Sequence, residues 1–143
     1  MSTRQASIER SIIIQASAET VWGIVSEPGW WVNSGALVEH RVEDRGGGVQ
    51  VVHDPDHGAF TFTTVALDPP RYASFRWHPR EPDEPATLTE FWIEDLTEGG
   101  VSLRVVESGF EGMPADKLHA ILTENAQGWA LELDVARSAA ERG

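Results

Sequence analysis

The chain has 143 residues, a formal net charge of −12 and no cysteine. A chain of this length buries enough surface to fold without a disulfide or a metal. The lack of cysteine excludes thiol nucleophiles, zinc–thiolate sites and iron–sulfur clusters. The acidic excess disfavours binding to nucleic acid or to an anionic membrane surface, because both need clustered lysine and arginine. No apolar run approaches the roughly 20 residues that a membrane span needs.

The ends and the irregular segments of the chain indicate one cytoplasmic domain, 1–143. Residues Met1–Arg10 lack the apolar core of a signal peptide. The densest irregular stretch, 78–85, contains three prolines, which remove backbone donors and fix φ. It therefore predicts a loop between strands and not a linker between domains.

The first third of the chain predicts a strand followed by short helices. Apolar residues alternate with polar ones over Ser7–Gln15, which is typical of a strand. Ser17 has the residue type of a helix N-cap, and Pro28 would end that helix. The glycine-bounded segment Gly29–Gly35 predicts a tight turn or a second short helix.

The rest of the chain predicts a meander of strands and then one long helix. Short turns between successive strands favour antiparallel pairing. Apolar residues at helical spacing predict a helix from Pro114 to about Ala140 that covers one face of the sheet. Gly128 within it is expected to allow close packing of helix on sheet. The six strands expected before it are Leu37–Glu43, Val49–Asp54, Ala59–Leu67, Arg71–His78, Thr87–Leu96 and Val101–Phe110.

This order of elements resembles the START-like, birch-pollen-allergen-like (SRPBCC) superfamily. Within it, the chain is most similar to the family named after the C-terminal domain of the activator of the heat-shock-protein-90 ATPase. The resemblance implies an α+β helix-grip fold, in which a curved antiparallel sheet of about seven strands wraps around the long C-terminal helix, with two short helices after the first strand. It also implies an internal cavity between sheet and helix. The segments that carry it are Ala18-Glu19-Thr20-Val21-Trp22, Asp68-Pro69-Pro70 with Phe75-Arg76-Trp77, Glu107-Ser108-Gly109-Phe110, and Gly128-Trp129 with Leu133.

Strand alternation turns His40 and Glu107 toward the interior. An imidazole there could move a proton near neutral pH, and desolvation would raise the pKa of the carboxyl. A sheet curled around a helix could bring the two side chains to one cavity as acid and base. The alternatives are a core histidine bonded to a backbone carbonyl, and a glutamate that is solvated or paired with arginine or histidine.

Aromatic side chains are the expected lining of that cavity. Trp31, Phe75, Trp77, Phe91 and Trp129 are expected to lie there and to contact a flat ligand, or to form ordinary core.

The strand register that the resemblance implies turns Trp92 outward, between Glu90 and Glu94. An outward tryptophan suggests a surface for a homodimer or a protein partner. The alternative is a ring that lies flat over its neighbours, beside Tyr72 or Arg76.

No metal or cofactor is expected. The histidines of the segment His53–His57 are separated by a proline, so a solvated turn is preferred to a metal site. The chain contains no nucleophile elbow, phosphate loop or dinucleotide fingerprint.

Three functions remain open from the sequence. The preferred one is a binding module for a hydrophobic or aromatic small molecule. The second is an enzyme of the cyclase, dehydratase or hydrolase kind that uses His40 and Glu107 as acid and base. The third, a co-chaperone-like regulator of a heat-shock-protein-90 ATPase, is implied by the family name alone.

Overall fold

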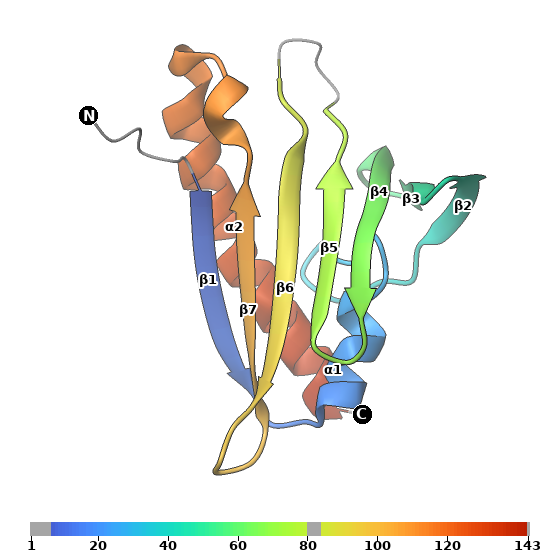
Figure 1. The fold of residues 1–143 in the computed structure, drawn as a ribbon, viewed down its shortest axis with the longest axis vertical. Helices are drawn as coiled ribbons and strands as arrows, with labels where there is room; N and C mark the ends of the chain where they lie inside the picture. Colours follow the sequence, from blue (N-terminus) through green and yellow to red (C-terminus); the bar gives the residue numbers. More distant parts are fainter. Residues whose placement is uncertain (1–6, 80–83, 143) are drawn as a thin grey trace.

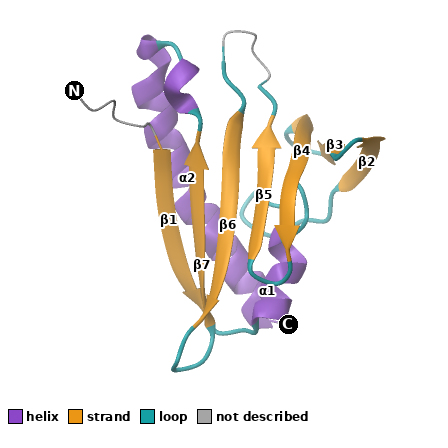
Figure 2. Ribbon diagram, viewed as in Figure 1, coloured by secondary structure: helices purple, strands orange, loops and turns teal. Residues whose placement is uncertain are grey.

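Seven strands form one curved antiparallel sheet, and two helices lie against the same face of it (Figures 1 and 2). The computed structural model describes residues 7–79 and 84–142, and the sheet order within them is β1-β7-β6-β5-β4-β3-β2. The predicted helix-grip arrangement is therefore confirmed. The strands are β1 (Ser7–Ile14), β2 (Arg41–Gly46), β3 (Val49–Asp54), β4 (Gly58–Asp68), β5 (Tyr72–Trp77), β6 (Thr87–Asp95) and β7 (Val101–Ser108).

Alternation of buried and less buried residues builds the centre of the sheet. In β7, Val101, Leu103, Val105 and Glu107 all face inward and are buried. The neighbouring strand β6 alternates in the same way, and its Phe91 lies directly opposite Val105. Both strands bury one face because α1 and α2 cover that face.

The helix α1 (Ala18–Val25) begins at the predicted N-cap, where the Ser17 hydroxyl oxygen accepts a hydrogen bond from the Thr20 backbone N–H at 3.1 Å. The helix α2 (Ala115–Arg142) has 28 residues and so measures about 42 Å. Figure 1 shows it crossing the sheet diagonally. A short 3-10 helix, η1 (Phe110–Gly112), connects β7 to it.

Two local expectations need correction. Of the two alternatives for residues 29–35, the turn is confirmed and the second short helix is wrong: only α1 lies between β1 and β2, and both Gly29 and Gly35 have positive φ angles, 71° and 92°. The strand expected over Leu37–Glu43 begins only at Arg41. The residues before it form a loop held by Asn33, whose side-chain oxygen accepts from the Val38 N–H at 3.1 Å.

Parts of the sequence-based expectations lie outside the described residues. These are the N-terminal residues 1–6 and residues 80–83 of the proline-rich loop. Neither described helix combines the length and apolarity that crossing a bilayer requires.

The turn after α1 brings Trp30 and Trp31 into the interior. Pro28 follows the end of the helix, and the Val32 N–H donates to the Gly29 carbonyl at 3.0 Å. A Cβ atom on Gly29 would lie 2.9 Å from Phe62 Cε2 and 3.1 Å from Val52 Cγ1. Glycine is therefore required here both for its positive φ and for its size.

We predict that Gly29→Ala lowers the free energy of unfolding by about 1–3 kcal/mol, because it combines an unfavourable φ with overpacking against two buried side chains. Gly23→Ala is the matched control: a Cβ atom there meets nothing within 4 Å, so helix propensity predicts a gain of up to about 1 kcal/mol. Urea denaturation measures both changes. Equal effects of the two substitutions would contradict the role assigned to Gly29.

Candidate functional site

Two adjoining hollows open between the inner face of the sheet and α2; together they are called the sheet–helix hollow. Their volumes are about 200 and 180 Å³. Both are lined by Trp77 of β5, Glu107 of β7 and Asn125 of α2. The larger one also has an apolar wall formed by Phe60, Phe110, Met113 and Ile121.

Glu107 is a buried carboxylate held by neutral donors. Its side chain accepts hydrogen bonds from Trp129 Nε1 at 2.9 Å, Thr87 Oγ1 at 2.9 Å and Asn125 Nδ2 at 3.2 Å. The residue is 2% exposed, and these three donors are all neutral groups. Burial raises the pKa of Glu107 above its ordinary value, and the three hydrogen bonds oppose that rise without cancelling it.

Trp31 occupies the centre of the space between sheet and helix. Its ring centroid lies 5.2 Å from that of Phe62, 5.8 Å from Trp77 and 5.6 Å from Trp129. It also contacts Phe75 and Phe91 at 5.7 and 5.6 Å. The wide cavity implied by the resemblance is therefore largely filled by this one side chain, and the sheet–helix hollow is what stays open beside it.

The structure separates the predicted site residues into three groups. Trp31, Trp77, Glu107 and Trp129 line the sheet–helix hollow. Phe75 and Phe91 are fully buried in the core next to Trp31. His40 lies elsewhere, in a cavity that shares no lining residue with the hollow.

His40 and Glu107 therefore do not meet as an acid and base pair. The alternation argument fails for His40 because this residue precedes β2 and is not part of a strand. Its ring is instead positioned by Asp54, with 2.9 Å between His40 Nε2 and Asp54 Oδ1. This pair lies on the far side of the sheet order from β7.

Asp54 links two histidines and closes the turn after β3. Its Oδ2 atom accepts from His57 Nδ1 at 2.7 Å and from the backbone N–H groups of Asp56 and His57 at 3.0 and 2.8 Å. Burial alone would raise its pKa, but the bonds from His57 and His40 and the backbone outweigh burial and lower the pKa to about 2. The segment His53–His57 thus joins the end of β3 to a turn at residues 55–57, which the buried Asp54 holds.

Three residues of the hollow were missed from the sequence. Asn125 and Thr87 hold Glu107, and Asn125 lies one helical turn before Trp129, a spacing that places both on one face of α2. His78 also lines the hollow, and its Nε2 lies 2.7 Å from Thr63 Oγ1. His78 could not be found in this way, because it follows the inward-facing Trp77 at the edge of the proline-rich loop and no regular spacing relates it to the hollow.

Asn33 ties the Trp30–Trp31 turn to α2. Its Nδ2 atom donates to Glu132 Oε1 and to the Trp30 carbonyl, both at 2.8 Å. Burial raises the pKa of Glu132, which lines the smaller part of the hollow. Gly128 lines the same part, and a Cβ atom there would meet nothing within 4 Å. The expectation that Gly128 serves close packing is therefore wrong; it leaves space beside the hollow.

Trp92 lies on the outer face of the sheet and is half-buried by its neighbours. Its ring centroid is 5.3 Å from that of Tyr72, and the guanidinium carbon of Arg104 lies 4.2 Å from the ring centroid. The ring is therefore covered by both neighbours, which corresponds to the alternative considered for it from the sequence.

Within the described residues, no three His, Asp or Glu side chains cluster as metal ligands would.

We predict a pH-dependent difference in stability between the wild type and Glu107→Gln. Because the folded state raises the pKa of Glu107 above 4.5, it binds a proton that the unfolded chain releases. The wild type therefore loses stability relative to Glu107→Gln as the pH rises from 4.5 through the raised pKa. Urea denaturation over that range measures the difference, and the exposed Glu98→Gln controls for the loss of one carboxyl charge. Parallel curves for wild type and Glu107→Gln would contradict a desolvated carboxyl.

We predict that the stability difference between the wild type and Asp54→Asn depends on pH in the opposite direction. The lowered pKa of Asp54 contributes stability that is fully present above 3.8 and is lost as the pH falls toward about 2. At neutral pH the variant should be less stable by about 1–3 kcal/mol, because it loses charge-assisted hydrogen bonds in a buried turn. This difference in stability should disappear at low pH. Urea denaturation measures it, and Asp56→Asn, at an exposed position, is the control. A gap that persists at the lowest pH would mean that the charge of Asp54 is not what stabilises the turn.

Comparison with known proteins places this fold in a family. A protein from Mesorhizobium loti has a crystal structure with a TM-score of 0.74 and 16% identity, with 95% of this chain and 97% of that chain covered. The solution structure of the Aha1 dimer from Colwellia psychrerythraea has a TM-score of 0.68 and 19% sequence identity, with 94% of this chain and 96% of that chain covered. The crystal structure of the di-domain ARO/CYC protein BexL of the BE-7585A biosynthetic pathway has a TM-score of 0.67 and 14% sequence identity, with 94% of this chain and 50% of that chain covered.

These likenesses concern the fold, since their sequence identities are low. No curated protein sequence matches the chain. The family model described as "Activator of Hsp90 ATPase homolog 1-like protein" matches residues 15–137, which is most of the chain and includes the hollow's residues Trp31, Glu107 and Trp129. The chain belongs to the family of Activator of Hsp90 ATPase homolog 1-like proteins.

Proposed function

We propose that this protein binds a small hydrophobic or aromatic molecule in the sheet–helix hollow, with Glu107 as its polar anchor. The observation that carries the proposal is a buried carboxylate where the two parts of the sheet–helix hollow meet, beside the aromatic side chain of Trp77 and held by three neutral donors. A carboxylate has about four acceptor sites, so three hydrogen bonds leave room for a ligand donor. Burying such a group costs stability, and a polar handle on a ligand is one reason to keep it.

The walls of the hollow define the chemistry of the ligand. Trp77 and Trp31 offer aromatic faces, and Phe110, Met113 and Ile121 offer aliphatic and aromatic contacts. No lysine or arginine lines the described part of either hollow, so a phosphate or carboxylate ligand would lack a counter-charge. Three further carboxylates, Glu84, Glu124 and Glu132, also line the hollow, so a flat molecule with a hydroxyl or N–H donor suits it better than an anion does.

An acid–base enzyme is the second candidate. Glu107 and His78 border the same hollow, which replaces the pairing with His40 considered from the sequence. A fold neighbour, BexL, is described as a di-domain ARO/CYC protein, but its likeness to this chain is one of fold. An enzyme would lose turnover in Glu107→Gln while keeping its affinity, whereas a binding module would lose affinity.

Partners and location stay secondary proposals. A fold neighbour, Aha1 of Colwellia psychrerythraea, is described as a dimer, and the outer face near Trp92 is the surface proposed for self-association here. The co-chaperone function rests on the family name, and no described residue singles out a surface for a chaperone. A cytoplasmic location stays a proposal that rests on the acidic composition.

Binding of 2-naphthol, an uncharged aromatic with one donor, tests the proposal by isothermal titration calorimetry. We expect saturable binding that Gly128→Leu weakens at least tenfold, because the new side chain extends into the hollow from a position with free space. Gly128→Ala is the matched control and should bind nearly as the wild type does.

The anchor is tested with a second ligand, 2-methoxynaphthalene, which lacks the donor. Glu107→Gln should weaken 2-naphthol by about tenfold, the usual size of one charge-assisted hydrogen bond, and should affect 2-methoxynaphthalene much less. Equal effects on the two ligands would remove Glu107 as the anchor. A lack of saturable binding by both ligands, or binding that Gly128→Leu leaves unchanged, would contradict the proposed site.

A further inference from the structure

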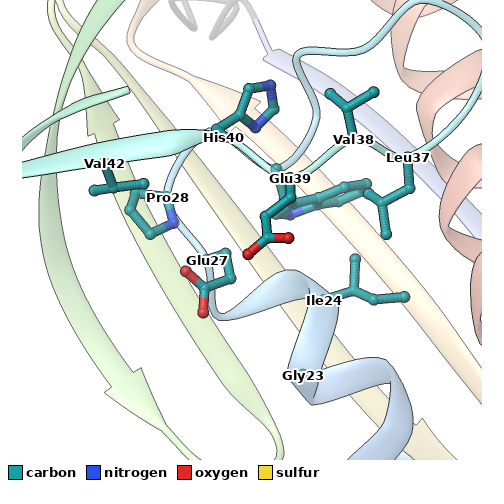
Figure 3. A pocket seen from close by; sticks show the side chains of 10 residues that line it. Gly23, Ile24, Glu27, Pro28, Leu37, Val38, Glu39, His40 and Val42 are labelled. Carbon is teal, nitrogen blue, oxygen red and sulfur yellow. The ribbon is translucent and has the colours of Figure 1, made fainter. Parts of the chain in front are cut away.

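A second cavity, of about 470 Å³, lies between α1 and the loop that leads into β2 (Figure 3). Its apolar walls come from Ile24 of α1, from Pro28 in the turn after α1, and from Leu37 in the loop. Its volume is within the range of small-molecule sites. It shares no described lining residue with the sheet–helix hollow, so a ligand would bind here independently of the hollow.

His40 borders this cavity with a buried ring. Its side chain is only 5% exposed and yet lines the cavity, so the cavity is what the ring's remaining surface faces. Its Nε2 atom lies 2.9 Å from Asp54 Oδ1, and its Nδ1 atom has no partner among the described residues. Trp30 Nε1, which also lacks a described partner, is sealed inside the protein, whereas His40 Nδ1 is not. Figure 3 shows one ring nitrogen of His40 turned toward the other lining side chains and one turned away from them.

Asp54 determines which nitrogen of His40 carries the proton. The Asp54 side chain is 3% exposed, and its pKa is lowered to about 2, so at neutral pH it is an ionised group that only accepts hydrogen bonds. Nε2 of His40 faces this carboxylate and must therefore be the donor. In the neutral ring, Nδ1 is then left with a lone pair and acts as an acceptor.

The remaining polar side chains of the cavity narrow the class of ligand. Glu27 and Glu39 line it, both are exposed, and no lysine or arginine is among its described lining residues. An anion would therefore find no counter-charge there. A neutral O–H or N–H group is what the oriented lone pair of His40 selects.

We propose that this cavity binds a small neutral molecule whose O–H or N–H group donates a hydrogen bond to Nδ1 of His40. The apolar body of the molecule lies against Ile24, Pro28 and Leu37. Asp54 is a positioning residue, which holds the ring and keeps the acceptor nitrogen on the cavity side. The site is separate from the sheet–helix hollow, where the acceptor is the carboxylate of Glu107.

The probe is p-cresol, and 4-methylanisole, which lacks the donor, is the matched ligand. The ring nitrogens of His40, assigned by their loss in His40→Phe, are followed by ¹H–¹⁵N NMR of the full chain at pH 8, where an ordinary imidazole is neutral. We expect the proton on Nε2, and a saturable shift of Nδ1 with p-cresol that 4-methylanisole does not produce. His40→Phe should weaken p-cresol about threefold to tenfold, as measured by calorimetry, which is the usual size of one neutral hydrogen bond.

Asp54→Asn tests the positioning role, because it should move the proton of His40 to the other nitrogen. The backbone N–H groups of Asp56 and His57 both donate to Oδ2, so the amide oxygen of the asparagine must take that place. Its NH₂ group then replaces Oδ1 and donates to Nε2 of His40, which leaves the ring proton on Nδ1. The variant should therefore lose the preference for p-cresol over 4-methylanisole.

Two glycine variants locate the binding. Gly23 lines the cavity, and a Cβ atom there meets nothing within 4 Å, so Gly23→Leu should abolish the His40 shift while Gly23→Ala should keep it. Gly128→Leu, which blocks the hollow, should leave the His40 shift unchanged. Loss of the shift in Gly128→Leu would mean that p-cresol acts from the hollow and would overturn this site, whereas failure of the hollow ligands alone would affect only the proposed function.

Four other results would overturn the proposal: a proton on Nδ1 of wild-type His40, no saturable shift with p-cresol, an equal shift with 4-methylanisole, or a shift that persists in Gly23→Leu. An unchanged ring proton in folded Asp54→Asn would remove the role of Asp54. Circular dichroism establishes that each variant is folded. If Asp54→Asn does not fold, the ligand pair and His40→Phe still decide whether the site exists.

Discussion

The packing of Trp31 against the aromatic side chains of the sheet and of α2 determines what the interior of this protein can hold. Five aromatic rings besides its neighbour Trp30 lie within 5.2–5.8 Å of the Trp31 ring, and each such pair adds about 0.5–1.5 kcal/mol beyond the burial of area. A sheet curved around a helix encloses space, and Trp31 fills most of it. The turn that delivers the ring depends on Gly29, and Asn33 fixes that turn to α2 through Glu132. The open space between the sheet and α2 is therefore the hollow beside Trp77 and Glu107.

The burial of Glu107 follows from the same geometry. Its strand alternates strictly, so a side chain two residues after Val105 must face α2. The aromatic cluster excludes water there. Hydrogen bonds from Trp129, Asn125 and Thr87 offset part of the cost of burying the carboxyl. Two of these donors lie one turn apart on α2, which means that the carboxylate also fixes how that helix is rotated on the sheet. The neighbour of Glu107 on β6, Thr89, has a buried hydroxyl with no partner among the described residues, so polar groups gather at this point of the interior.

Periodicity predicted the parts of the structure that regular elements build. The strands β6 and β7, the helix α2, the inward direction of Glu107 and the burial of Trp129 all follow from spacings of two or of three to four residues. His40 was misplaced because the loop before β2 obeys neither period and is held by side-chain bonds from Asn33 and Asp54. Gly128 was misread because a glycine in a helix is explained equally by close packing or by open space, and only coordinates separate the two. The role of Trp31 as filling, and not only as lining, depends on long-range packing that no local pattern encodes.

Adjacent tryptophans with different neighbours explain how one small domain can offer two unlike cavities. Trp30 lines the cavity in which His40 lies, and Trp31 lines the sheet–helix hollow. Their rings meet edge to face, with 6.1 Å between the ring centroids. On one side, exclusion of water raises the pKa of the Glu107 carboxyl and favours an uncharged partner. On the other, Glu27 and Glu39 line the cavity and are exposed, so both stay solvated. The same residue type is thus desolvated at position 107 and solvated at positions 27 and 39, because only Glu107 lies on a buried face of the sheet under α2.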